Sequence, residues 1–283
     1  MAVIKDRAIK VSSIKTINIH MEHFESAQEV AKTCATREIT NSSFDDIPKK
    51  DFGDWQGVKS YGEALDLLRN GYQPTVDAMN GVFKASKNGE AKRIHFQNQI
   101  QGFAPVVPLA LKGVPNCMVN MTMKPIKAKV IDVCYDMTAS CMTSSKKIIE
   151  AGQILLGTIV ELEKQGYRFN IYAVQSYSDD RSCDMLSVKV KSSGQPLDLK
   201  RISFPLTHTA FFRVIGFDWY SKVPGGKYRS GYGCALGYKL DKNGLQEVAR
   251  NLYGKSAVYF SAAMILNEKK EHIKEVITNG GKA

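Results

Sequence analysis

The chain has 283 residues, of which 43% are hydrophobic and 24% are charged, and its formal net charge at pH 7 is +11. These values are ordinary for a globular protein and exclude a disordered tail, a collagen-like repeat and a coiled-coil rod. No apolar run approaches the roughly 18 residues of a membrane helix, and the N-terminus has no apolar signal segment, so we expect a cytoplasmic protein without membrane contact.

The first 125 residues are predicted to form an α+β region. β-Branched residues at 11–19 indicate a strand, and proline among apolar residues at 101–120 indicates a packed irregular segment or short strands. Helices are predicted over 25–34, 60–70 and 76–85. Ser60 and Glu63 have the spacing of a capping box at the start of the second helix, and Gly71 follows its end.

From residue 126 the pattern becomes that of an α/β domain. A buried strand at 127–136, a long amphipathic helix at 145–166 and a strand at 167–178 predict a βαβ unit. A third strand at 184–193 alternates like an edge strand. Later elements are predicted as helices over 209–220, 245–252 and 268–278 and an apolar strand over 256–266. We therefore predict an α+β region at 1–125 and a three-layer α/β/α sheet domain, Rossmann-like, at 126–283.

The six cysteines form no C-x-x-C pair and lie mostly in apolar segments. In such segments a reduced thiol behaves as a small hydrophobic group. A disulfide framework is not expected in a cytosolic chain. We therefore predict buried, structural thiols.

The loop after the first strand of the βαβ unit is rich in oxygen donors. Asp136, Thr138 and Ser140 follow one another at spacings of two residues. Open α/β sheets bind ligands in loops at the carboxyl ends of their strands. A carboxylate with two hydroxyls suits a hard divalent cation such as Mg²⁺, although the same hydroxyls also cap helices.

This arrangement resembles the von Willebrand factor A domain, whose usual motif is D-x-S-x-S. The resemblance implies a metal-ion-dependent adhesion site completed by a later threonine, for which Thr207 is the candidate at 71 residues after Asp136, with Thr209 as the alternative. The family's final aspartate, usually in T-D-G, has no counterpart here. The metal site is therefore expected to be degenerate.

A wider resemblance extends to an uncharacterised family of tailed-bacteriophage proteins. The matching segments are WQGVKSYGEALDLLRNGY, PVVPLALKGVPNCM, the A-like domain and FPLTHTAFFRVIGFDWYSKVP, which together span about residues 50–265. The resemblance implies a phage-encoded protein in the host cytoplasm. It implies no established activity.

Two functions remain open from the sequence. The first is a non-catalytic protein-binding module with a degenerate divalent-metal site, whose partner, by resemblance to intracellular A-type domains, is an AAA-type ATPase. The second is nucleic-acid binding by the basic C-terminal half, because residues 1–120 carry 15 basic against 13 acidic residues and the remainder carry 24 against 15. Its candidate residues interleave cations with aromatic rings: Lys222, Lys227, Tyr228, Arg229 and Tyr232. We expect no enzyme, because no base and nucleophile are placed together by spacing.

Overall fold

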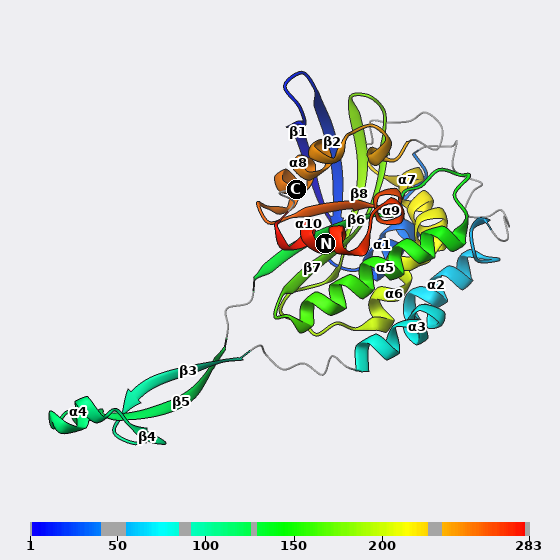
Figure 1. Cartoon of the computed structure of the whole chain (residues 1–283). Helices are drawn as coiled ribbons and strands as arrows, with labels where there is room; N and C mark the ends of the chain where they lie inside the picture. Colours follow the sequence, from blue (N-terminus) through cyan, green and yellow to red (C-terminus); the bar gives the residue numbers. More distant parts are fainter. Residues whose placement is uncertain (1, 41–54, 85–91, 126–128, 226–233, 281–283) are drawn as a thin grey trace.

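The structure is a computed structural model that describes residues 2–40, 55–84, 92–125, 129–225 and 234–280 (Figure 1). Its centre is a six-stranded mixed sheet. In spatial order the strands are β1 (Val3–Lys10), β2 (Thr16–Phe24), β8 (Ser182–Lys191), β7 (Arg168–Ser178), β6 (Val130–Asp136) and β9 (Val258–Ser261). Strands from both sides of the predicted boundary at 125–126 thus share one sheet.

The predicted strand–helix–strand unit is confirmed. β6 and β7 pair in parallel, and α5 (Ser145–Lys164) connects them. β9 pairs in parallel with the other side of β6, whereas β7 and β8 form an antiparallel pair. The prediction of an edge strand at 184–193 is wrong. The N-terminal hairpin of β1 and β2 extends the sheet beyond β8, so β8 is an interior strand with most of its residues buried.

Helices cover both faces of this sheet and form two separate hydrophobic cores. The smaller core lies under α8 (Lys242–Tyr253) and η5 (Leu236–Tyr238). The helices on the opposite face are α1 (Ala27–Thr36), α2 (Tyr61–Asn70), α3 (Gln73–Lys84), α5, α6 (Leu199–Thr207), α7 (Phe217–Lys222), α9 (Ala262–Asn267) and α10 (Lys270–Thr278). The fold is therefore mixed α/β with a sheet flanked by helices, as the sequence predicted.

Local capping sets where several helices begin. The Ser60 side chain accepts a hydrogen bond from the N–H of Glu63, and Gly71 ends α2 in the left-handed region at φ 80°, as predicted. The predicted strand over 256–266 is too long. It ends at Ser261, because this side chain caps α9 by accepting the N–H of Met264.

The buried carboxylate of Glu22 joins β2 to α7. Glu22 on β2 is fully buried and accepts two hydrogen bonds from the guanidinium of Arg37, at 2.8 and 2.5 Å. The indole N–H of Trp219 on α7 donates to the same carboxylate at 2.7 Å. A buried charge is tolerated only when it is paired and hydrogen-bonded, so this contact fixes α7 against β2.

Residues 92–125 form a second, smaller sheet that extends from the body of the molecule (Figure 1). It consists of β3 (Lys92–Gln99), β5 (Met118–Pro125) and β4 (Ala104–Pro105), with α4 (Val107–Leu111) between β4 and β5. β4 is a short strand of the kind predicted for the proline-containing segment, whereas the helix α4 was not predicted and the segment is not packed, since none of its residues is buried. We call residues 92–125 the arm. Among the described residues no helix is long and apolar enough to cross a membrane.

Candidate functional site

Asp136 ends β6, and its carboxylate is completely buried in a hydrogen-bonded network. One oxygen, Oδ1, accepts the N–H of Thr138 at 2.9 Å. The other, Oδ2, accepts the hydroxyls of Ser176 on β7 at 2.5 Å and of Tyr259 on β9 at 2.6 Å. The carboxylate therefore joins three neighbouring strands at their ends.

Burial controls the electrostatics of this network. Loss of solvation raises the pKa of Asp136, and the hydrogen bonds from Ser176, Tyr259 and Thr138 offset part of that effect. The Ser176 hydroxyl also accepts the N–H of Leu236 at 2.8 Å, which ties the segment before α8 to the same carboxylate. The buried carboxylate thus accepts hydrogen bonds from Thr138, Ser176 and Tyr259.

The two hydroxyl residues of the motif have different surroundings. Thr138 is buried, and its hydroxyl accepts the backbone N–H of Ser176 at 2.8 Å. Ser140 lies two residues further along the loop, where its hydroxyl accepts the N–H of Met142 at 3.3 Å. Asp136 and Thr138 thus belong to one network, whereas Ser140 lies in the turn that follows.

Thr207 and the Asp136 carboxylate lie on opposite faces of the sheet. Ile131, Val133 and Tyr135 of β6 pack into the core with α5 and α6, whereas Cys134 packs into the core under α8. Since side chains alternate along a strand, Asp136 points to the face of Cys134. Thr207 is the last residue of α6, which covers the opposite face.

The hydroxyls predicted to complete the metal site are also already engaged. The Thr207 hydroxyl donates to the carbonyl of Ser203 at 2.8 Å and lies 3.0 Å from the hydroxyl of Thr75. The Thr209 hydroxyl donates to the carbonyl of Gln56 at 2.9 Å. The described residues also contain no cluster of three or more His, Cys, Asp or Glu suited to a metal. This donor set does not fit a divalent cation as it is arranged.

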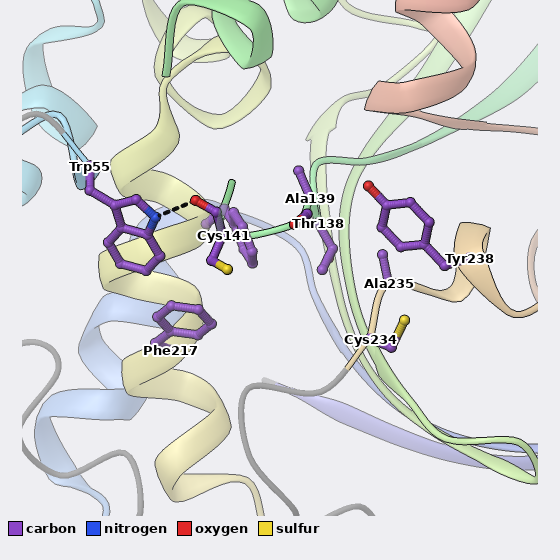
Figure 2. A pocket seen from close by; sticks show the side chains of 10 residues that line it. Trp55, Thr138, Ala139, Cys141, Phe217, Cys234, Ala235 and Tyr238 are labelled. Carbon is purple, nitrogen blue, oxygen red and sulfur yellow. Dashed lines mark hydrogen bonds between the residues drawn. The ribbon is translucent and has the colours of Figure 1, made fainter. Parts of the chain in front are cut away.

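A pocket of about 680 Å³ opens beside the motif loop, at the carboxyl end of β6 (Figure 2). Its lining consists of Trp55, Thr138, Ala139, Ser140, Cys141, Phe212, Phe217, Cys234, Ala235 and Tyr238. In Figure 2, Trp55 and Phe217 form one wall, and Cys234, Ala235 and Tyr238 form the wall across from it. Aromatic rings and small side chains dominate, which gives the pocket an apolar character.

Arg213 connects Trp55 to the loop that follows β6, from a fully buried position. Its guanidinium donates to the carbonyl of Trp55 at 2.5 Å and to that of Thr143 at 2.7 Å, and it lies 4.5 Å from the centroid of the Trp55 ring. Burial lowers the pKa of Arg213 to about 10, so the side chain stays charged at neutral pH. No ion pair among the described residues includes it. Carbonyl oxygens and the indole ring therefore stabilise this cation.

Arg213 lies in a π-helical turn, η4 (Phe211–Gly216), that continues into α7. The Gln175 amide on β7 donates to the carbonyl of Phe211 at 2.9 Å. A Cβ at Gly216 would lie 1.6 Å from the Oε1 of Gln175, so a larger residue there would displace the Gln175 side chain. π-Helical turns are frequent at functional sites, and this one supplies Phe212 to the pocket.

Of the predicted nucleic-acid residues, the structure describes only Lys222. Its ammonium contacts the carboxylate of Asp218 at 2.7 Å and donates to the carbonyl of Cys34 at 2.8 Å. This ammonium therefore links α7 to α1 through contacts within the fold. The other four, Lys227, Tyr228, Arg229 and Tyr232, lie outside the described residues.

Sequence reasoning missed most of the pocket. The segment FFRVIGFDW carried a usable signal, because a single arginine in an apolar helix must find buried partners.

The cysteine prediction was confirmed for three buried thiols, Cys34, Cys134 and Cys183. Cys141, which is exposed, and Cys234, which is partly exposed, instead line the pocket. All six cysteines are free.

The site defined by this fold is an apolar pocket at the end of a mixed α/β sheet, next to a self-contained carboxylate network. A family model described as Domain of unknown function (DUF7192) matches residues 8–278, and the chain belongs to this family. The comparisons with curated proteins and with solved structures gave no match.

Proposed function

We propose that the protein is a non-catalytic, phage-encoded protein-binding module that holds an apolar anchor segment of its partner in the pocket beside the motif loop. The observation that carries this proposal is the pocket's apolar, aromatic lining at the carboxyl end of β6. Its volume of about 680 Å³ accommodates more than one side chain. Open α/β sheets bind their ligands at this end of the strands.

The surroundings of the pocket favour a protein over a small polar substrate. Met142, beside the lining residue Cys141, is 89% exposed, and Tyr238 on the opposite wall is 54% exposed. Apolar side chains around a hollow are typical of protein-docking surfaces. Among the described lining residues there are thiols and hydroxyls but no carboxylate, lysine or histidine, which favours binding over acid–base catalysis.

In this proposal the adhesion-type metal site is degenerate and binds no cation. Asp136 acts as a structural residue, since its carboxylate accepts hydrogen bonds from Thr138, Ser176 and Tyr259. The partner class suggested by the resemblance to intracellular A-type domains is an AAA-type ATPase. Recognition would then depend on apolar contact rather than on a bridging cation.

A selection of short random peptides on the full-length protein tests the proposal. We expect enrichment of peptides with an aromatic or branched aliphatic anchor, and a shift in Trp55 emission on binding, because this indole lines the pocket. Ala139→Trp places a large side chain in the pocket and should weaken binding about tenfold or more, which corresponds to about 1.4 kcal/mol.

The matched control is Ala8→Trp, which adds the same side chain at an exposed position of β1. It should leave the peptide affinity unchanged. Peptides that bind the Ala139→Trp variant as well as the wild type, or the absence of any enriched peptide, would contradict the proposal.

A further inference from the structure

The arm, residues 92–125, has a defined backbone. β3 and β5 pair antiparallel over eight residue pairs, and β4 joins the other side of β5. Gly102 allows this third strand to approach, because a Cβ there would lie 2.1 Å from the carbonyl oxygen of Val119. The arm is therefore a folded element rather than a loose connection.

This element lacks a core of its own. The described side chains of the arm are those of residues 95–122, and none of them is buried. Small sheets are normally stable only when an apolar face is covered. The arm thus has the structure of a folded unit without the burial that usually maintains one.

Three exposed apolar side chains of the arm lie close together. Phe96 lies opposite Met121 in the β3–β5 register, and the ring of Phe103 lies 6.3 Å from that of Phe96. These three side chains are 60%, 50% and 66% exposed, respectively. Further exposed apolar side chains of the arm are Ile100, Val107, Leu111 and Val114. An exposed apolar cluster of this kind marks an interaction surface.

The charge of the arm restricts the kind of partner. No acidic residue occurs between Glu90 and Asp132, whereas Lys92, Arg93, Lys112 and Lys124 lie within the arm. A second copy of the chain carries the same +11 net charge and the same all-basic arm, so like charges oppose its approach. Electrostatic complementarity to the basic arm therefore favours a partner with an acidic surface.

Among acidic surfaces, the side chains favour a protein. Aliphatic groups such as Ile100 and Leu111 gain free energy only when another apolar surface covers them. Single-stranded nucleic acids depend on stacking against aromatic rings, of which the arm has two phenylalanines. Membrane interfaces favour Trp and Tyr, and the arm has neither.

We infer that the arm is a docking element for a second protein whose contact surface combines apolar side chains with acidic ones. This surface is separate from the pocket beside β6. β3 lies at the edge of its sheet, so its outer backbone groups can also pair with a strand of the partner.

The test uses short random peptides selected on the full-length protein, with an arm variant, Phe96→Ser combined with Leu111→Ser. We expect one class of enriched peptides that contains both acidic and apolar residues. Its affinity should fall about tenfold or more in the arm variant and should weaken in high salt. Ala139→Trp should not affect this class, which separates the arm from the pocket.

Ile14→Ser is the matched control, because this side chain is 95% exposed in the turn between β1 and β2. The arm variant, Ile14→Ser and Lys112→Glu should keep the wild-type melting temperature, since the side chains that they replace are exposed. Lys112→Glu should weaken the preference for acidic peptides without removing an apolar contact, because three basic residues of the arm remain.

Four results would overturn the inference. The first is that no enriched peptide class depends on the arm. The second is self-association in sedimentation velocity that the arm variant abolishes, which would make a second copy the occupant. The remaining two are arm-dependent binding of a single-stranded oligonucleotide or of phosphatidylserine vesicles, which would assign the arm to a nucleic acid or to a membrane.

Discussion

The hydroxyl of Tyr259 on β9 donates a hydrogen bond of 2.6 Å to the carboxylate of Asp136 on β6. Both residues are buried, and β6 and β9 are parallel neighbours. The contact supplies a hydrogen-bond donor to a fully buried carboxylate. Together with Thr138, Asp136 thus forms a structural connection between strands.

Removing this hydroxyl should destabilise the fold. Tyr259→Phe deprives the buried carboxylate of one donor, so the free energy of unfolding should fall by about 1–3 kcal/mol in chemical denaturation. Tyr238→Phe is the control, because Tyr238 is 54% exposed. Equal stability of the two variants would show that the Asp136 network contributes little.

Calorimetry with Mg²⁺ and Mn²⁺ should show no saturable binding at millimolar ion. The reason is that Asp136 accepts three hydrogen bonds, while the Thr207 hydroxyl is engaged on the opposite face of the sheet. Saturable heat that disappears in Asp136→Ala would instead establish an adhesion-type metal site. It would require the network around Asp136 to rearrange.

Stability should decrease as the pH falls from about 6.5 towards 4, through His208. Burial lowers the pKa of His208 from 6.5 to about 4, with a smaller opposing effect of Glu63. A depressed pKa means that the unfolded chain binds the proton first, so the stabilisation is present above pH 6.5 and is lost as the pH falls. The loss should reach about 3 kcal/mol.

Comparison of wild type with His208→Asn across this pH range isolates the effect, because asparagine retains an acceptor for the N–H of Ala210. The variant should show a flatter pH dependence of its unfolding free energy. Parallel curves for the two proteins would exclude His208 as the titrating group.

Two glycines of α5 should respond to alanine in opposite directions. A Cβ at Gly152 would lie 2.1 Å from the carbonyl oxygen of Leu206, so Gly152→Ala should push α6 away and cost about 1–3 kcal/mol. Gly157 has no atom within 4 Å of that position, and Gly157→Ala should stabilise the helix by about 0.5–1 kcal/mol. Thermal unfolding of both variants measures the difference. Similar effects would contradict the close packing of α5 on α6.

The sequence predicted local elements well where the signal was local. Ser60 and Gly71 bound α2 because capping and left-handed backbone depend on single residues, and hydrophobic periodicity indicated α5 and the strands around it. The prediction of an edge strand at 184–193 was wrong, because an interior strand has a second neighbouring strand that can come from a distant part of the sequence. That neighbour, β2, comes from residues 16–24.

For the site, the sequence by itself determined which oxygen donors follow β6, namely Asp136, Thr138 and Ser140. Only the tertiary structure decided what they do. The alternation of side chains along β6 directs Asp136 to the face of the sheet opposite α6, where the hydroxyls of Tyr259 and Ser176 donate to it. Thr207 lies on the other face and is bonded within α6. The pocket likewise depends on long-range packing, because Arg213 connects Trp55 to a loop that lies far away in the sequence. Spacing along a chain specifies chemistry, but the face on which each group emerges is fixed only when distant strands and helices pack together.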